Sequence, residues 1–122
     1  MNKVILTGRL TAAPELRTTR SGKSVSEFSL AVDRIVNGEK QVDFIRCTAW
    51  DKQAELLCKY CGQGHKIAVV GALRVEKYTD AKGNERYKTY VLVSEIEFLQ
   101  CRTPNREHEN GQIPEVDDDL PF

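Results

Sequence analysis

The sequence has no long hydrophobic run. Its most apolar stretch, residues 67–73, is far shorter than the roughly 20 residues that a membrane-spanning helix needs. The first residues also lack the basic, apolar and small-residue regions of a secretory signal peptide. We therefore expect a cytoplasmic protein that does not associate with membranes.

Residues typical of catalysis are equally scarce. The chain has only two histidines, and we find no nucleophile beside a base, no pair of catalytic carboxylates and no phosphate-binding glycine loop. The composition, with 40% hydrophobic and 30% charged residues over 122 positions, is that of one globular domain. We expect a binding protein with no catalytic residues and no cofactor, and not an enzyme.

Cysteines are few, and their pattern is not the dense framework of a small secreted protein. They are Cys47, Cys58, Cys61 and Cys101. Because a cytoplasmic domain with an adequate core needs no cross-link, we predict reduced thiols. A zinc or thiol-redox site at Cys58 and Cys61 with His65 is the main alternative from another functional class. That ligand set is incomplete without Cys47 or Cys101, so we predict no metal site.

A net charge is also lacking, since 18 Lys and Arg balance 18 Asp and Glu. Zero net charge argues against a nucleic-acid-binding protein, because phosphate contacts need a positive surface. The balance conceals a division along the chain. Residues 1–99 hold 16 basic and 12 acidic side chains, a net +4, whereas residues 100–122 hold 2 and 6, a net −4. The sequence therefore predicts a basic body and an acidic tail.

Short segments rich in Val, Ile, Phe and Thr alternate with turn signals, which is typical of β-strands. The predicted strands cover residues 3–10, 25–34, 41–50, 65–78 and 86–99. Asn37-Gly38 predicts a tight hairpin between the second and third strands, and residues 80–84 predict a turn between the last two.

One helix is predicted directly after residue 50. Asp51 can cap it, and Gly62 stands where it would end. Between them an apolar stripe falls at helical spacing, formed by Ala54, Leu57, Cys58 and Cys61. Three strands, one helix and two strands is the element order of the five-stranded OB-fold barrel. We therefore predict an all-β fold with one short helix over residues 1–100 and a disordered acidic tail over residues 101–122.

Alternation along residues 44–50 separates two faces of one predicted strand. The plainer core face consists of Ile45, Cys47 and Ala49. Phe44, Arg46 and Trp50 then point outward together. Aromatic rings beside a cation are suited to stacking bases and holding phosphates.

Alternation in the next strand gives a similar division. Its predicted core set is Ile67, Val69, Leu73 and Val75, which leaves Arg74 and Tyr78 on the opposite face. Every base offers a π-face, so such a surface binds single strands with little sequence preference. The candidate cations are Arg17, Arg34, Arg46, Lys52, Arg74, Lys77 and Arg86, with the loop residues Arg20 and Lys23 and also Lys88 as further candidates.

These patterns leave alternatives open. Phe44 and Trp50 can instead pack in a core or a subunit interface, where large aromatic side chains are common. Bulges in barrel strands can also reverse the alternation. A domain of this kind could serve RNA or proteins alone.

The end of the sequence combines acidic and apolar residues. They are Asp117, Asp118, Asp119, Leu120, Pro121 and Phe122. The aspartates can steer the tip to a basic surface, and the apolar groups and the terminal carboxylate can enter a partner's pocket. A solvated tail that only aids solubility is the alternative.

Five further segments join this tip in a resemblance to a known family. They are NKVILTGRL at 2–10, PELR at 14–17, FSLAV at 28–32, DFIRCTAW at 43–50 and LRVEKYTD at 73–80. Over nearly its whole length the chain resembles the bacterial single-stranded DNA-binding protein (SSB) family.

The resemblance implies an OB fold, usually a homotetramer, that wraps single-stranded DNA over platforms aligned with Phe44, Trp50 and Tyr78. It implies a nucleoid-associated role in replication, recombination and repair, with helicases, polymerase subunits, primase and repair or recombination proteins docking on the tip. The chain departs from many relatives at residues 34–36, where an additional aromatic is often found, so we expect one platform fewer. Its tail is also short, which keeps the tip close to the DNA surface.

Overall fold

The computed structural model describes residues 1–101 of the chain. Residues 102–122 lie outside the described residues, and with them the predicted partner-binding tip at residues 117–122. The described elements are β1 (Val4–Leu10), β2 (Arg17–Thr18), β3 (Ser24–Val36), β4 (Glu39–Trp50), α1 (Asp51–Tyr60), β5 (Lys66–Thr79) and β6 (Glu85–Gln100). Five of these strands are the predicted ones, whereas the two-residue β2 was not predicted.

The strands form a closed sheet in the order β1-β5-β6-β4-β3. A second pairing of β1, with β3 at Leu10↔Leu30, completes the ring. All the pairings are antiparallel except the short parallel contact of β4 with β6, at Cys47↔Val91 and Thr48↔Leu92. β2 adds to the edge of β3. With α1 between the third and fourth barrel strands, this arrangement confirms the predicted five-stranded OB-fold barrel.

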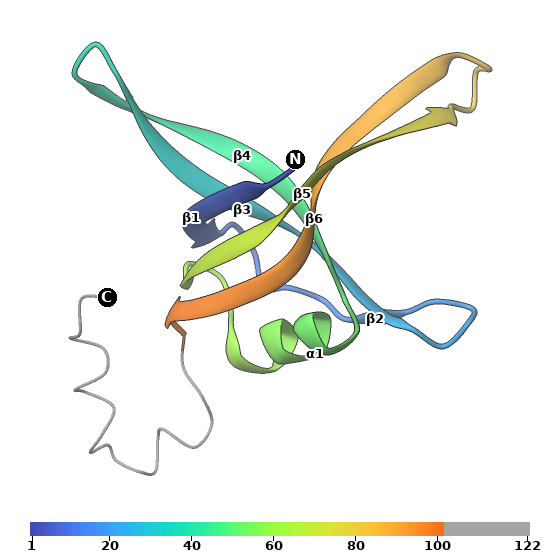
Figure 1. Ribbon diagram of the computed structural model, residues 1–122, viewed down its shortest axis with the longest axis horizontal. Helices are drawn as coiled ribbons and strands as arrows, with labels where there is room; N and C mark the ends of the chain where they lie inside the picture. The colour runs from blue at the N-terminus through green and yellow to red at the C-terminus, as the bar shows by residue number, and fades with distance from the viewer. Residues whose placement is uncertain (102–122) are drawn as a thin grey trace.

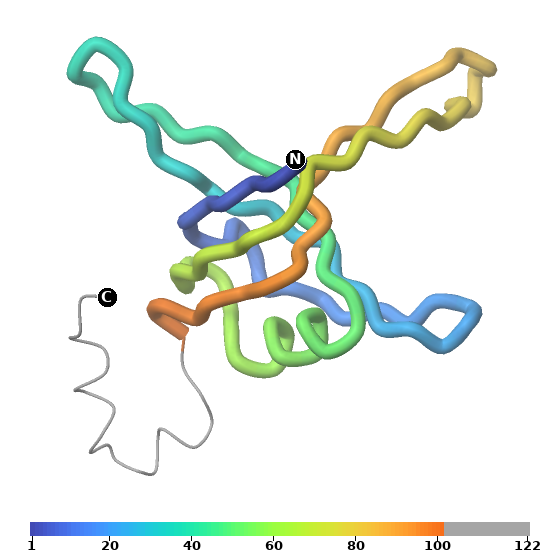
Figure 2. Tube along the Cα trace, in the orientation of Figure 1, coloured from blue at the N-terminus to red at the C-terminus, as the bar shows by residue number. Residues whose placement is uncertain are grey.

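Two long hairpins extend beyond the barrel as arms (Figures 1 and 2). The β3–β4 arm turns at Asn37 and Gly38, whose φ angles of 52° and 81° fit the tight turn that this dipeptide predicts. At the tip of the β5–β6 arm, the Asp80 carboxylate accepts hydrogen bonds from the backbone N–H groups of Lys82 and Asn84, both at 2.9 Å. The bond from Asn84 is the main reason that the pKa of Asp80 lies below its usual value.

The core fills the barrel and the space beneath it that α1 covers. Leu30, Leu57, Ile67 and Val69 are fully buried there. β5 and β6 approach closely at Gly71, where any Cβ would meet the backbone carbonyl of Leu92. Only glycine fits that position without moving the neighbouring strand.

The predicted core set of β5 was right for two of its four residues and wrong for the other two. Ile67 and Val69 are buried, but Leu73 is 45% and Val75 is 59% exposed. Beyond Gly71 the strand leaves the barrel and continues in an arm (Figure 1). Alternation along a strand defines two faces, but it does not show whether another layer covers either face.

The predicted helix ends also differ from the structure. Asp51 is the first helical residue and does not cap the helix; the N-cap is Trp50, which makes no side-chain capping bond. The C-cap is Cys61, one residue before the predicted Gly62. Within residues 1–101, no helix is both long and apolar enough to span a membrane.

Candidate nucleic-acid interface

The side chains of β4 alternate as the sequence predicts. Phe44 is 70% and Trp50 is 38% exposed, and Arg46 is exposed between them. On the other side of the strand, Cys47 and Ala49 are buried. We call the side of the sheet that carries Phe44, Arg46 and Trp50 the outer face.

Strand pairing extends the outer face onto β3 and β2. Trp50 lies opposite Val25, which in turn lies opposite Arg17 of β2. Residues that pair across strands share a face of the sheet, so Arg17 stands in one row with the Trp50 ring. The Arg17 Nη2 atom also contacts a carboxylate oxygen of Glu27 at 3.2 Å.

The parallel contact of Thr48 with Leu92 extends the outer face onto β6 and β5. Alternate residues of β6 then follow the same face, and β5 supplies a partner for each. The pairs are Tyr90 with Arg74, Lys88 with Glu76, and Arg86 with Tyr78. The fold therefore brings Arg17, Arg46, Arg74 and Arg86 onto one surface with Phe44, Trp50 and Tyr78.

Two predicted cations lie on other faces. Arg34 pairs with Gln41, on the side of β4 opposite Phe44, and its Nε atom contacts both carboxylate oxygens of Asp43 at 3.0 and 2.9 Å. Lys77 pairs with Tyr87 on the reverse side of the β5–β6 arm and contacts Glu85 at 2.8 Å. Both basic side chains have a carboxylate partner, and so does Arg86 on the outer face, whose Nε atom contacts Asp80 Oδ2 at 3.0 Å. The alternation that separates the two faces of each strand also separates Arg34 and Lys77 from the outer face.

Lys52 comes two residues after Trp50, in the first turn of α1, and is exposed. It belongs to the helix and not to the sheet, so strand pairing does not place it on the outer face. In the chain only Asp51 separates it from Trp50.

Two hollows include residues of the outer face. A groove of about 730 Å³ lies along the β5–β6 arm and takes in residues from both of its sides; its lining is Arg46, Glu76, Lys77, Tyr78, Tyr87, Lys88 and Thr89. A smaller cleft of about 250 Å³ is lined by Glu27, Phe28, Ser29, Arg46, Cys47, Thr48, Lys88 and Tyr90. Both include Arg46 and Lys88, so they adjoin at these cations.

Tyr90 is a site residue that the sequence prediction missed. Its hydroxyl donates to Glu76 Oε2 at 2.7 Å, and this bond raises the pKa of the phenol. The Lys88 ammonium lies 5.6 Å from the centre of the Tyr90 ring, within the range of a cation–π interaction. Tyr90 continues the alternation of Arg86 and Lys88 along β6. That alternation points to the site only when the parallel contact of β4 with β6 is known.

Comparison with known families decides the relationship. The model of the Single-strand binding protein family matches residues 1–99. The chain belongs to this family. The resemblance that the sequence segments carry is thereby confirmed.

Bacterial members of the family are similar over most of the chain. The single-stranded DNA-binding protein 1 of Staphylococcus aureus is 42% identical over 108 residues, covering 86% of this chain and 69% of that protein. Single-stranded DNA-binding protein 3 of Clostridium acetobutylicum is 37% identical over 137 aligned positions, covering 100% and 95%. The chain spans only 61% of the Enterococcus faecalis relative, to which it is 37% identical.

A solved structure of the same fold contains a bound strand. It is the Plasmodium falciparum SSB complex with single-stranded DNA, which matches with a TM-score of 0.75 and 25% sequence identity. The match covers 82% of this chain and 96% of that one.

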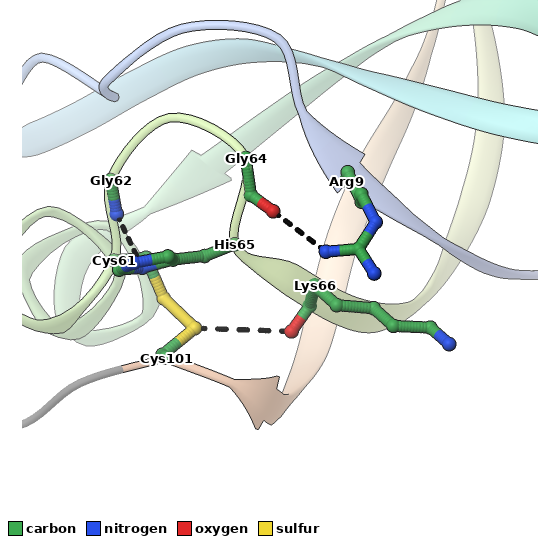
Figure 3. Close-up of a disulfide and its surroundings, with 7 residues drawn as sticks. All are labelled: Arg9, Cys61, Gly62, Gly64, His65, Lys66 and Cys101. Carbon is green, nitrogen blue, oxygen red and sulfur yellow. Dashed lines mark hydrogen bonds between the residues drawn. A yellow bond between two sulfur atoms is a disulfide. The ribbon is translucent and has the colours of Figure 1, made fainter.

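Away from the outer face, this family member contains a disulfide between Cys61 and Cys101 (Figure 3). The prediction that all thiols are reduced is therefore wrong. Cys61 caps α1 and Cys101 follows the last residue of β6, and the fold brings their Cα atoms to 5.1 Å across 40 residues of sequence. Spacing alone could not reveal this proximity.

The alternative of a zinc site at Cys58 and Cys61 is not supported. Cys58 donates to the Ser26 hydroxyl at 3.5 Å, whereas the ligand atoms of Cys61, His65 and Cys101 lie within 4.8 Å of one another. The two sulfurs of that group are bonded to each other and supply no thiolate. His65 Nδ1 accepts the Gly62 N–H at 2.9 Å (Figure 3).

Thiol counting should show two classes of cysteine. Unfolding without a reductant should expose two thiols, from Cys47 and Cys58, and unfolding with a reductant should expose four. In the folded protein Cys47 should react far more slowly than Cys58, because burial raises the Cys47 pKa to about 12 and the thiolate is the reactive form. A count of four thiols before reduction would contradict the disulfide.

Proposed function

We propose that this chain binds single-stranded DNA with little sequence preference through its outer face. The observation that supports this most directly is the shared face of Phe44, Trp50 and Tyr78, with arginines between the rings. Each base that stacks on a ring contributes roughly 1–3 kcal/mol, and the cations add a salt-dependent attraction for phosphates. The complex of the Plasmodium protein with a single strand, on the same fold, supports the same use of the barrel.

The proposed contacts differ in kind. The rings are stacking platforms, and Arg17, Arg46, Arg74 and Arg86 hold the backbone beside them. Lys52 extends this positive surface past Trp50. Arg34 and Lys77 face other directions, so they act as secondary contacts for a strand that passes around an arm.

The proposal includes assembly and recruitment. Leu73, Val75 and Tyr87 occupy the reverse side of the β5–β6 arm, and all three are exposed. Apolar groups of this size on one side of an arm suit a contact between subunits, and we take this chain to be a homo-oligomer, a tetramer as in its family. Residues 1–100 would then be the DNA-binding domain and residues 101–122 the tail, whose tip recruits replication, repair and recombination proteins.

Fluorescence of Trp50, the only tryptophan of the chain, tests the binding proposal. Oligothymidine should quench it through stacking, whereas a duplex of equal length, whose bases are already stacked, should not. Raising the salt concentration should weaken binding with a logarithmic slope of about 0.7 per phosphate contacted. Equal quenching by duplex, or tighter binding of oligouridine than of oligothymidine, would contradict the proposal.

A further inference from the structure

We propose that the small cleft on the outer face binds one nucleobase and that Glu27 makes it favour bases with an exocyclic amino group. The proposal rests on the proposed function, because it assigns a specific subsite to the strand that the outer face binds. The cleft lies where β3, β4 and β6 meet, between the part of the outer face that carries Trp50 and the part that carries Tyr78.

The size of the cleft limits its ligand. Its volume of about 250 Å³ lies below the roughly 300 Å³ at which pockets for drug-sized molecules begin. Arg46 and Lys88 stand at its edge and also line the larger groove, so a strand in that groove has its phosphates beside the cleft. One planar base is therefore the ligand that both its size and its surroundings suit.

The cleft contains hydroxyl groups without partners. The Thr48 side chain lines it and is only 7% exposed, and within residues 1–101 its hydroxyl makes no hydrogen bond. The hydroxyl of the neighbouring Ser29 is likewise unpaired among the described residues. A buried polar group without a partner costs free energy, so a ligand that bonds to it is stabilised.

Glu27 is the acidic residue in the lining of the small cleft, where Arg46 and Lys88 suit phosphates. Arg17 contacts one of its oxygens at 3.2 Å and Lys88 contacts the other at 3.4 Å, which holds the side chain in place between them. The side chain is still 48% exposed, and each oxygen keeps a further lone pair. A carboxylate repels phosphate but accepts hydrogen bonds from an amino group.

The bases differ in the hydrogen-bond donors and acceptors on their pairing edges, and the groups in the cleft can distinguish these patterns. Cytosine presents an amino donor beside a ring nitrogen that accepts, and adenine does the same. Glu27 can accept from the amino group while a hydroxyl of Thr48 or Ser29 donates to the ring nitrogen. Thymine presents the reverse pattern, a carbonyl oxygen where cytosine has its amino group and an N–H where cytosine has its accepting nitrogen. In the pose described for cytosine, a hydroxyl can accept from that N–H, but the Glu27 carboxylate faces an acceptor with no hydrogen between them.

The test compares Glu27→Gln with the unchanged chain. Labelled oligocytidine and oligothymidine deoxynucleotides of equal length are titrated by fluorescence anisotropy above pH 7. For each protein we take the ratio of the dissociation constants for the two oligonucleotides. Intrinsic differences between the oligonucleotides affect both proteins equally, so a change in this ratio reports the subsite. We expect Glu27→Gln to lower the preference for cytosine over thymine by roughly fivefold, mostly through tighter binding of oligothymidine.

Glu39→Gln is the matched control, because it removes the same charge from the opposite side of β4. It should leave the ratio unchanged, and thermal unfolding should show that both variants are folded. An equal gain in affinity for both strands in Glu27→Gln, or an unaltered ratio, would overturn the base subsite while leaving the proposed function in place. Absence of binding to either strand by the unchanged chain would overturn both.

Discussion

Replacing Phe44 and Trp50 together by alanine should weaken binding of oligothymidine by roughly 30-fold or more. Loss of one base–ring contact costs about 1–3 kcal/mol, so two contacts cost at least about 2 kcal/mol, which is a factor of about 30 in the dissociation constant. Phe44 is 70% exposed and Trp50 is 38% exposed. Neither ring belongs to the buried core cluster or to the apolar side chains packed against it, so the barrel should stay folded without them.

Anisotropy of a labelled strand is the measurement, since the variant has no tryptophan. Phe98→Ala provides the control, because Phe98 is also 38% exposed but lies near the end of β6, in edge-to-face contact with Tyr60. The affinity of the Phe98→Ala variant for oligothymidine should stay within a few fold of the affinity of the unchanged chain. A folded double variant that binds as tightly as the parent would refute stacking as the source of affinity.

Removing residues 117–122 should abolish recruitment of partner proteins. The aspartates and the apolar residues after them act together as one docking peptide in our proposal, so no binding energy remains when they are absent. Binding of a purified helicase or polymerase subunit from the same cell to the chain, with and without these residues, is the direct measurement. Phe122→Ala separates the two contributions, because it keeps the acidic run and removes only the ring.

The same deletion should leave DNA affinity equal or tighter at low salt. Residues 100–122 carry a net −4 and residues 1–99 a net +4, so the tail competes with phosphates for the barrel. Added salt should remove the difference, because it screens the attraction. Partner binding that survives the deletion would show that recruitment uses another surface.

Local chemistry made much of the fold predictable from sequence. Asn37-Gly38 and the Asp80 turn determine their own backbone geometry, because glycine accepts a positive φ and the aspartate bonds to the N–H groups that follow it. Alternation along β4 likewise placed Phe44 and Trp50 on one side and Cys47 in the core. Each of these features depends on residues a few positions apart.

The limits of prediction appear where distant segments meet. Tyr90 and Glu27 belong to the site only because β6 pairs with β4 and β4 pairs with β3. The exposure of Leu73 depends on where β5 leaves the barrel. A strand pattern specifies two faces, but it does not specify which neighbours cover them.

The sequence by itself determined the strand pattern, the turns, the position of the helix, the division of charge and the outward direction of Phe44 and Trp50. The tertiary structure alone decided the Cys61–Cys101 disulfide, the small cleft beneath Glu27 and the separation of Arg34 from the other cations. The physical reason is the range of the interactions involved. Alternation and turn chemistry act over a few residues, whereas closure of the barrel joins side chains that lie far apart in the chain.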